Sequence, residues 1–245
     1  MRNPVEGSAL AACTTADCPV INAGDGGHLH PTQTLTDLVT LNQELGKLDD
    51  ITVGLCGDLK FGRTVHSLVK ALCNYKNVHF VLIATKGLEL PQNFKDIITK
   101  SSCTYSECSS LEDGIKALDV LYMTRIQKER FLNGEEFNAF VLDNHIMSMA
   151  KEKMLVLHPL PRVDEIAYEV DDDSRAAYFR QARYGVFARM ALILTLLNEK
   201  TEDNIIKGEV TCKKCSNPKC VTNIEKNIEC RVLDGVCEFC EHTVI

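Results

Sequence analysis

The cysteines near the C-terminus are the side chains whose spacing most directly predicts chemistry. Cys215 and Cys220 form one close pair, and Cys237 and Cys240 form a second pair after sixteen intervening residues. Two such pairs are what a tetrahedral zinc site with four thiolate ligands needs. Four thiolates leave no open coordination position, so the zinc is predicted to be structural. Cys212 and Cys230 are surplus, and either could replace one of the four.

A second group of reactive side chains lies at the ends of predicted elements. In "HLHPTQTLTDL", Pro31 suits the first position of a helix, which places His30 and Gln33 at a helix N-terminus, where an anion or a polarised oxygen binds. Polar and cationic residues also follow three apolar segments: Arg63 and Thr64, Arg125 and Gln127, and His158 and Arg162. One arginine alone is more often a solvated charge, and His30 alone more often a capping or core residue. Together, several guanidinium groups at one crevice fit a small polyanion.

These side chains need a scaffold, and the apolar pattern predicts one. Uninterrupted apolar runs predict buried parallel strands, and helical patterns alternate with them. The strands are predicted at 51–58, 79–85, 120–124, 139–143 and 154–161, and the helices at 31–45, 64–75, 94–100, 111–118 and 174–197. The fold class is therefore α/β, a doubly wound parallel sheet domain followed by a small β-rich zinc domain.

Composition bounds the function. The chain is 45% hydrophobic and 25% charged, as in globular proteins. A net charge of −7 argues against a nucleic-acid partner. The N-terminus has no legible signal peptide, which predicts a cytoplasmic protein. The longest apolar stretch, 186–197, is too short for a membrane span and is interpreted as a core helix.

Four motifs resemble the catalytic chain of the aspartate carbamoyltransferase family: "HPTQTLTDL", "GDLKFGRTVHSL", "YMTRIQKER" and "HPLPRVDEI". The resemblance implies a transferase of pyrimidine biosynthesis that moves a carbamoyl group from carbamoyl phosphate to L-aspartate. His30 would stabilise the carbamoyl oxygen, with Gln33 near the carbamoyl nitrogen, and Arg2 would contact carbamoyl phosphate. The remaining substrate-binding residues implied are Arg63, Thr64, Arg125, Gln127, Pro159 and Leu160.

The resemblance also implies an unusual organisation. The stretch "CSNPKCVTN" is similar to the zinc domain of the family's regulatory chain, which favours Cys215 and Cys220 as ligands. The family's N-terminal carbamoyl-phosphate domain is expected to be missing, which would expose apolar surface on the final helix. The expected parts are a remnant of that domain (1–23), an aspartate-binding domain (24–198), a linker (199–207) and a zinc domain (208–245).

Two functions remain open at this point. The chain could be a carbamoyltransferase that forms a homo-oligomer or assembles with a separate carbamoyl-phosphate-domain chain. It could instead be a non-catalytic aspartate-binding and assembly module that works with a complete catalytic chain.

Overall fold

The computed structural model describes residues 1–125, 140–198 and 206–245. It divides into two compact units, which are described one at a time. One unit is residues 33–188, called here the α/β unit, and the other joins residues 1–32 to residues 189–245 and is called the cysteine unit. Within the described residues, no helix is long and apolar enough to cross a membrane.

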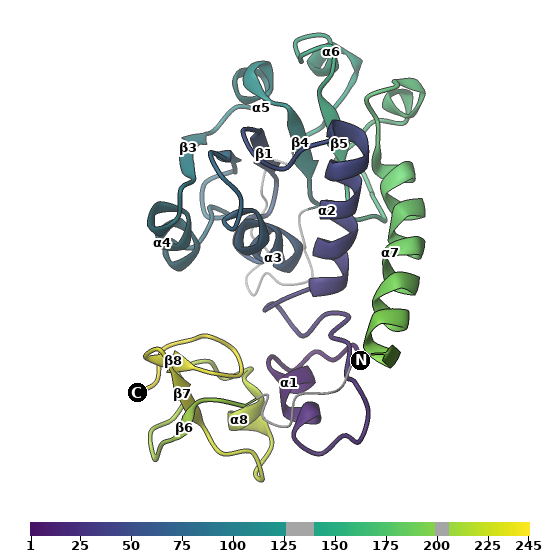
Figure 1. Ribbon diagram of the computed structural model, residues 1–245. Helices are drawn as coiled ribbons and strands as arrows, with labels where there is room; N and C mark the ends of the chain where they lie inside the picture. The colour runs from purple at the N-terminus through teal and green to yellow at the C-terminus, as the bar shows by residue number, and fades with distance from the viewer. Residues whose placement is uncertain (126–139, 199–205) are drawn as a thin grey trace. The chain divides into compact units, whose positions relative to one another are not determined.

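The α/β unit is built on a five-stranded, fully parallel sheet (Figure 1). Its strands stand in the order β3-β2-β1-β4-β5. They are β1 (Thr52–Cys56), β2 (His79–Ile83), β3 (Thr104–Cys108), β4 (Val120–Met123) and β5 (Leu155–Leu157). The strand order reverses direction between β1 and β4, and such a switch point is where open α/β sheets bind ligands, at the carboxyl ends of the strands. The predicted parallel α/β sheet is confirmed.

Each face of the sheet buries its own apolar cluster. Alternate strand residues point to opposite faces, so Phe80 and Tyr122 belong to one cluster while Val81 and Met123 belong to the other. The first face is covered by α2 (Pro31–Leu45), α3 (Arg63–Leu72) and α4 (Gln92–Lys100). The second is covered by α5 (Leu111–Gly114), the 3₁₀ helix η1 (Ile115–Ala117), α6 (Asn144–Met147) and the 3₁₀ helix η3 (Tyr168–Asp172).

Two strand predictions were wrong, for different reasons. The edge strand β3 was missed because its sequence, TYSEC, is polar and mostly exposed, whereas the prediction relied on apolar runs. The run 139–143 is not a strand of the sheet. In its described part, Leu142 makes one isolated bridge to Ile166, while β5 pairs directly with β4. Leu142 is fully buried in the second apolar cluster. The run is therefore apolar because it packs on the sheet, not because it pairs within it.

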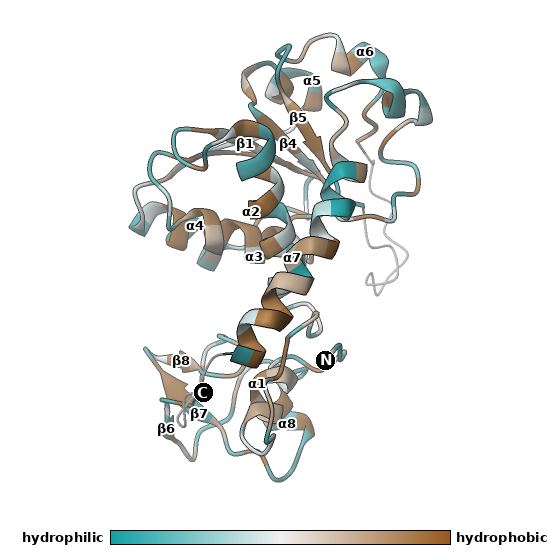
Figure 2. Cartoon of the chain, turned by 45° about the vertical axis from the view of Figure 1, so that its right-hand side comes forward, coloured by the Kyte–Doolittle hydropathy of each residue, from teal (hydrophilic) through white to brown (hydrophobic). Residues whose placement is uncertain are grey.

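The last long helix, α7 (Tyr178–Asn198), begins four residues later than the predicted start at 174. Its interpretation as a core helix was wrong in its C-terminal half. The large apolar side chains there are exposed, as the resemblance implied, and Figure 2 shows this part of the helix mostly brown. The exposed residues are Val186, Phe187, Met190, Ile193, Leu194 and Leu197.

The cysteine unit pairs the N-terminal segment with the tail. The segment forms α1 (Ser8–Cys13), and the tail forms α8 (Val221–Ile224) and the antiparallel strands β6 (Glu209–Val210), β7 (Arg231–Leu233) and β8 (Val236–Cys237). The Glu6 backbone N–H donates to the Lys219 carbonyl at 3.0 Å, and the buried Glu6 carboxylate accepts from Asn217 Nδ2 at 2.6 Å. Gly7 has φ 82°, and a Cβ there would lie 2.6 Å from Cβ of Phe239. Only glycine fits at this close approach.

Candidate active site and metal centre

The carboxyl ends of β1 and β4 are fastened together beside the switch point. The Thr124 backbone N–H donates to the Cys56 carbonyl at 2.9 Å, and its hydroxyl accepts from the Asp58 N–H at 3.1 Å. Gly57 lies between Cys56 and Asp58 in the chain and has φ 116°. A Cβ on it would lie 2.3 Å from the Thr124 carbonyl oxygen. Glycine is therefore required where the two strand ends meet. Arg125, half-buried, follows Thr124 at this edge.

Arg63 and Thr64 begin α3, which follows the β1 end through the turn at Asp58–Gly62. Both side chains are half-buried. Thr64 also contacts the interior, because its side chain is hydrogen-bonded to the hydroxyl of the fully buried Tyr122. The start of α3 is thereby tied to the middle of β4.

A buried polar network lies beneath this edge, centred on Asp37 of α2. Asp37 is 0% exposed, and its Oδ1 accepts from Nε2 of Gln33 at 2.8 Å and from Nε2 of Gln181 at 2.6 Å. Its Oδ2 accepts from the Tyr122 hydroxyl at 3.1 Å. Burial, and then the Asp37 charge, raise the pKa of Tyr122 well above its ordinary value, so this hydroxyl keeps its proton and donates it.

The network continues to the loop after β5. The His158 backbone N–H donates to Oε1 of Gln181 at 2.9 Å. The Leu160 N–H donates to Nδ1 of His158 at 2.8 Å, so Nε2 must carry the ring proton, which it gives to Glu165 at 2.7 Å. Burial, the largest single effect, would raise the pKa of Glu165, but the hydrogen bonds from His158 and from backbone N–H groups together outweigh it and lower that pKa. Glu165 is thus a carboxylate that holds the His158 ring.

The loop that His158 supports has a strained backbone. Leu160 has φ 50°, a left-handed conformation that side chains other than glycine and asparagine seldom adopt. Such strain persists only where the surroundings impose it, and it gathers at functional sites. Pro159 and Leu160, which follow the carboxyl end of β5, are both half-buried, whereas His158 is 2% exposed.

The structure brings several of the predicted substrate-binding residues to one unit: Gln33, Arg63, Thr64, Arg125, Pro159 and Leu160. Gln127 lies outside the described residues. Arg162 does not join them as a third guanidinium for an anion, because it is ion-paired with Asp171 and stacked over the Tyr168 ring at 4.6 Å. Arg2 and His30 belong to the cysteine unit, where Arg2 is exposed and His30 is half-buried.

Sequence reasoning missed the residues that hold the site in place. Asp37 lies four residues after Gln33 on α2, a spacing at which helical side chains meet, and this signal was available. Gln181, Tyr122 and Glu165 gave no such signal, since their partners are remote in sequence or lie in an ordinary loop.

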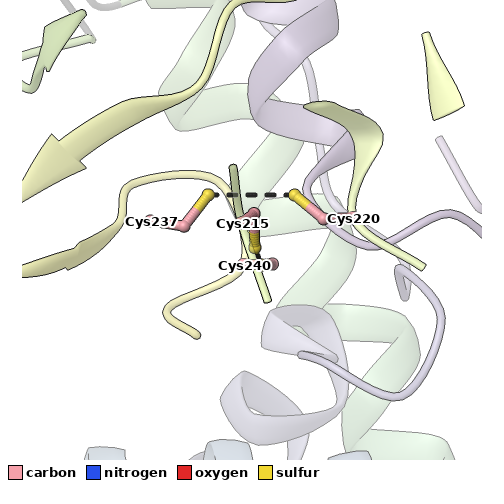
Figure 3. A group of neighbouring side chains, drawn as sticks. All are labelled: Cys215, Cys220, Cys237 and Cys240. Carbon is pink, nitrogen blue, oxygen red and sulfur yellow. Dashed lines mark hydrogen bonds between the residues drawn. The ribbon is translucent and has the colours of Figure 1, made fainter. Parts of the chain in front are cut away.

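The second candidate site is the cysteine cluster of the tail (Figure 3). The structure brings together the four cysteines that the spacing singled out, and their sulfurs all lie within 4.8 Å of one another. The sulfurs of Cys215 and Cys240 are 3.3 Å apart, and those of Cys220 and Cys237 are 3.8 Å apart. Metal–sulfur bonds of about 2.3 Å in a tetrahedron separate the sulfurs by about 3.8 Å. The four residues therefore fit a tetrahedral metal ion.

The surplus cysteines are not part of this group. Cys212 is exposed, and Cys230 is buried in the same apolar cluster without being one of the four.

The four clustered thiols need a cation to ionise together. The contact with Cys237 raises the pKa of Cys220 most, Cys240 opposes it, and burial adds to it, which brings the pKa to about 11. A bound divalent cation would reverse this shift.

Two family models match this chain, one after the other. The family described as aspartate/ornithine carbamoyltransferase, Asp/Orn binding domain, matches residues 49–196, and its carbamoyl-P binding domain matches residues 1–43. The expectation that the carbamoyl-phosphate domain is missing was therefore wrong, since the first 43 residues match that domain. Both matches end before the cysteine-rich tail.

Relatives named aspartate carbamoyltransferase catalytic subunit include one from Clostridium perfringens, 58% identical over 204 residues, and one from Finegoldia magna, 57% identical over 201 residues. These matches cover 81% and 80% of this chain, and the chain spans 66% of the length of each relative.

Solved structures give the same result. An aspartate transcarbamoylase from Trypanosoma cruzi, in complex with carbamoyl aspartate and phosphate, has a TM-score of 0.73 at 43% identity, over 80% of this chain and 63% of that one. The catalytic subunit of aspartate transcarbamoylase from M. jannaschii has the same score and identity, over 80% and 65%. With these matches to its sequence and its sheet, the chain belongs to the aspartate/ornithine carbamoyltransferase family.

Proposed function

We propose that the chain takes part in carbamoyl transfer from carbamoyl phosphate to L-aspartate, giving N-carbamoyl-L-aspartate and phosphate for pyrimidine synthesis. The observation that carries the proposal is the edge of the α/β unit where the carboxyl ends of β1, β4 and β5 lie. There Arg63, Arg125 and the strained Pro159–Leu160 backbone follow the ends of β1, β4 and β5. The buried network around Asp37 holds the segments that carry them.

The proposed roles follow from the chemistry of each group. Arg63 and Arg125 bind the two carboxylates of L-aspartate through bidentate hydrogen bonds, with Gln127 supporting Arg125. Thr64 and the backbone at Pro159 and Leu160 hold the same substrate. No covalent intermediate with the protein is needed, because positioning two reactants side by side lowers the barrier by itself.

The remaining predicted roles concern the carbamoyl group. His30 stabilises the charge that develops on the carbamoyl oxygen, as an oxyanion donor. Gln33 binds the carbamoyl nitrogen, and Arg2 contacts carbamoyl phosphate. A T. cruzi relative is described in complex with carbamoyl phosphate and aspartate together, which supports this pair of substrates.

We propose further that the cysteine cluster holds structural zinc. Four thiolates fill the coordination sphere, so zinc would supply folding energy rather than a site for substrate. Since four thiolates leave no open coordination position for substrate, the proposed role of the tail is assembly of the oligomer rather than chemistry.

The test is formation of carbamoyl aspartate by the purified chain, with L-aspartate affinity measured by calorimetry. Arg125→Ala is expected to weaken aspartate binding at least about 30-fold, because removing one partner of a desolvated charge pair costs about 2–5 kcal/mol. Arg175→Ala is the matched control, since Arg175 is paired with Asp173 at 2.7 Å in the same unit. Equal affinity of both variants and the parent would refute the proposal.

A non-catalytic aspartate-binding and assembly module is the second candidate. It predicts Arg125-dependent aspartate binding without turnover, and copurification with a longer catalytic chain. Turnover by the chain alone, lost in Arg125→Ala, rejects it.

A further inference from the structure

The hydrogen bonds around Asp37 permit only one orientation of each amide that contacts it. A carboxylate accepts and never donates, so Gln33 and Gln181 must both face Asp37 with their NH₂ groups, as their Nε2 distances of 2.8 and 2.6 Å indicate. The backbone N–H of His158 only donates, which places Oε1 of Gln181 at the other end of that amide. The direction of every bond from β5 to α2 is thus fixed by the chemistry of the groups.

Gln33 is the last member of this series. With its NH₂ group bound to Asp37, its carbonyl oxygen lies at the opposite end of the amide. An amide turned the other way would set that oxygen against a buried carboxylate oxygen and remove one of the donors to Asp37, which costs about 1–3 kcal/mol. Asp37 therefore determines which end of the Gln33 amide is presented.

We propose that Asp37 is a positioning residue for specificity: it presents the Gln33 carbonyl oxygen to the NH₂ group of the carbamoyl substrate. The proposal rests on the proposed function. An acetyl group has the same shape as a carbamoyl group but carries a methyl in place of the NH₂, and it offers no hydrogen to this oxygen. Sites built around such a hydrogen bond discriminate strongly against the analogue that lacks it.

The rigidity of Asp37 makes it suited to this task. It is 0% exposed, and its donors come from three elements, Gln33 of α2, Tyr122 of β4 and Gln181 of α7 (Figure 1). Gln181 and Tyr122 are 1% and 0% exposed, so neither can exchange Asp37 for water. Three buried donors on separate elements prevent the carboxylate from rotating. The Gln33 amide that is hydrogen-bonded to it is therefore also held in one orientation.

The test uses two ligands that differ only at this group, N-carbamoyl-L-aspartate and N-acetyl-L-aspartate. We expect the parent chain to bind the carbamoyl compound at least about fivefold more tightly, which is the lower end of the cost of a lost buried hydrogen bond. Asp37→Leu should bring the ratio of the two affinities close to one. Asp37→Asn should keep it, because its Oδ1 can accept from both glutamines while its Nδ2 donates to the Tyr122 hydroxyl.

Two further variants separate positioning from stability. Leu41→Ala, one turn later on α2 and 0% exposed, should lower the melting temperature and leave the ratio unchanged. Gln181→Leu, which removes one donor from Asp37, should lower the ratio part of the way and serves if Asp37→Leu does not fold.

The outcomes are distinguishable. A parental ratio kept in Asp37→Leu or, failing that variant, in Gln181→Leu overturns the role of Asp37. A ratio of one in the parent, with both ligands bound, overturns the role of Gln33 and with it the proposal, while the proposed function stands. Binding of neither ligand by the parent overturns the proposed function itself.

Discussion

The α/β unit and the cysteine unit differ in what fills their interiors. Both faces of the parallel sheet are packed with aliphatic and aromatic side chains, in two clusters that draw on five strands and the helices over them. Among the described residues of the cysteine unit, the buried core cluster has eight members, and five of them are cysteines. The remaining three are Ala11, Val221 and Phe239.

This difference shows where the stability of each unit must come from. Each large apolar side chain buried in the α/β unit contributes about 1.5–3 kcal/mol. Three buried apolar residues, with partly buried Val5, Leu10, Ile206, Ile228 and Val244 packed against them, are too few to offset the chain entropy lost by the tail, as in other domains of this size. We therefore propose that the stability of the cysteine unit depends on metal coordination, whereas that of the α/β unit depends on buried apolar area.

Removing the metal is expected to have the largest effect and to separate the two units. Zinc bound to four thiolates supplies about 10–16 kcal/mol in small zinc domains. A strong chelator should abolish the dispersed amide resonances of residues 206–245 in an NMR spectrum and leave those of the α/β unit in place. If metal analysis shows no zinc and the dispersed tail resonances persist, the tail does not need metal to fold, and the contrast between the two units is wrong.

The surplus cysteines provide matched controls for this experiment. Cys220→Ser removes a member of the four-sulfur group and should lower zinc content together with tail structure. Cys230→Ser leaves that group complete and should keep one zinc per chain, although Cys230 is also buried.

A core truncation should act on the other unit alone. Leu68 of α3 is 1% exposed and packs in the first apolar cluster, so Leu68→Ala is expected to lower the free energy of unfolding of the α/β unit by about 2–5 kcal/mol. Urea titration followed by circular dichroism measures this loss. Zinc content should not change, and a parallel loss of zinc would mean that the two units do not depend on separate forces.

The two units were also unequally predictable from the sequence. The cysteine group was found by spacing, because coordination needs only a set of ligands at suitable intervals. The central strands were found because burial on both faces leaves uninterrupted apolar runs. The exposed edge strand Thr104–Cys108 has no such constraint and was missed.

The site was predictable only where chemistry is displayed at the end of an element. Arg63, Arg125 and Gln33 stand at such ends, which is why the sequence could single them out as candidates; their roles remain predictions. The groups that fix them could not, because the partners of Asp37 include Tyr122 and Gln181, which lie 85 and 144 residues away and meet only in the folded sheet. Arg162 looked equivalent to Arg125 until the structure paired it with Asp171.

A pH titration should detect a charged contact that is confined to the cysteine unit. Burial lowers the pKa of His28, but the hydrogen bond with Asp25 and then the ion pair with Glu241 outweigh it and raise that pKa to about 9 from 6.5. His28 lies 3.0 Å from Asp25 and 3.6 Å from Glu241. Its contribution is therefore complete below pH 6.5 and disappears as the pH rises through about 9.

The expected loss across this window is about 3 kcal/mol in the stability of the cysteine unit. Urea titrations of the parent chain and His28→Gln between these limits measure it, and the variant should lose the slope. His79→Gln, in the α/β unit, should leave the slope of the cysteine unit unchanged. An identical slope in His28→Gln would show that the contact carries no charge.

The smallest expected effect concerns a helix cap in the α/β unit. The Ser110 hydroxyl accepts from the Asp113 N–H at 3.2 Å and so caps the short helix α5, whose Leu111 packs in the second apolar cluster. Ser110→Ala should cost about 1 kcal/mol in urea titrations, whereas Ser110→Gly should cost only a few tenths, because water can then reach the uncapped N–H groups. Ser102→Ala, whose hydroxyl donates to the Tyr75 carbonyl at 3.2 Å rather than capping a helix, is the control. Equal losses for Ser110→Ala and Ser110→Gly would mean that packing of Leu111, rather than the cap, sets the stability of this helix.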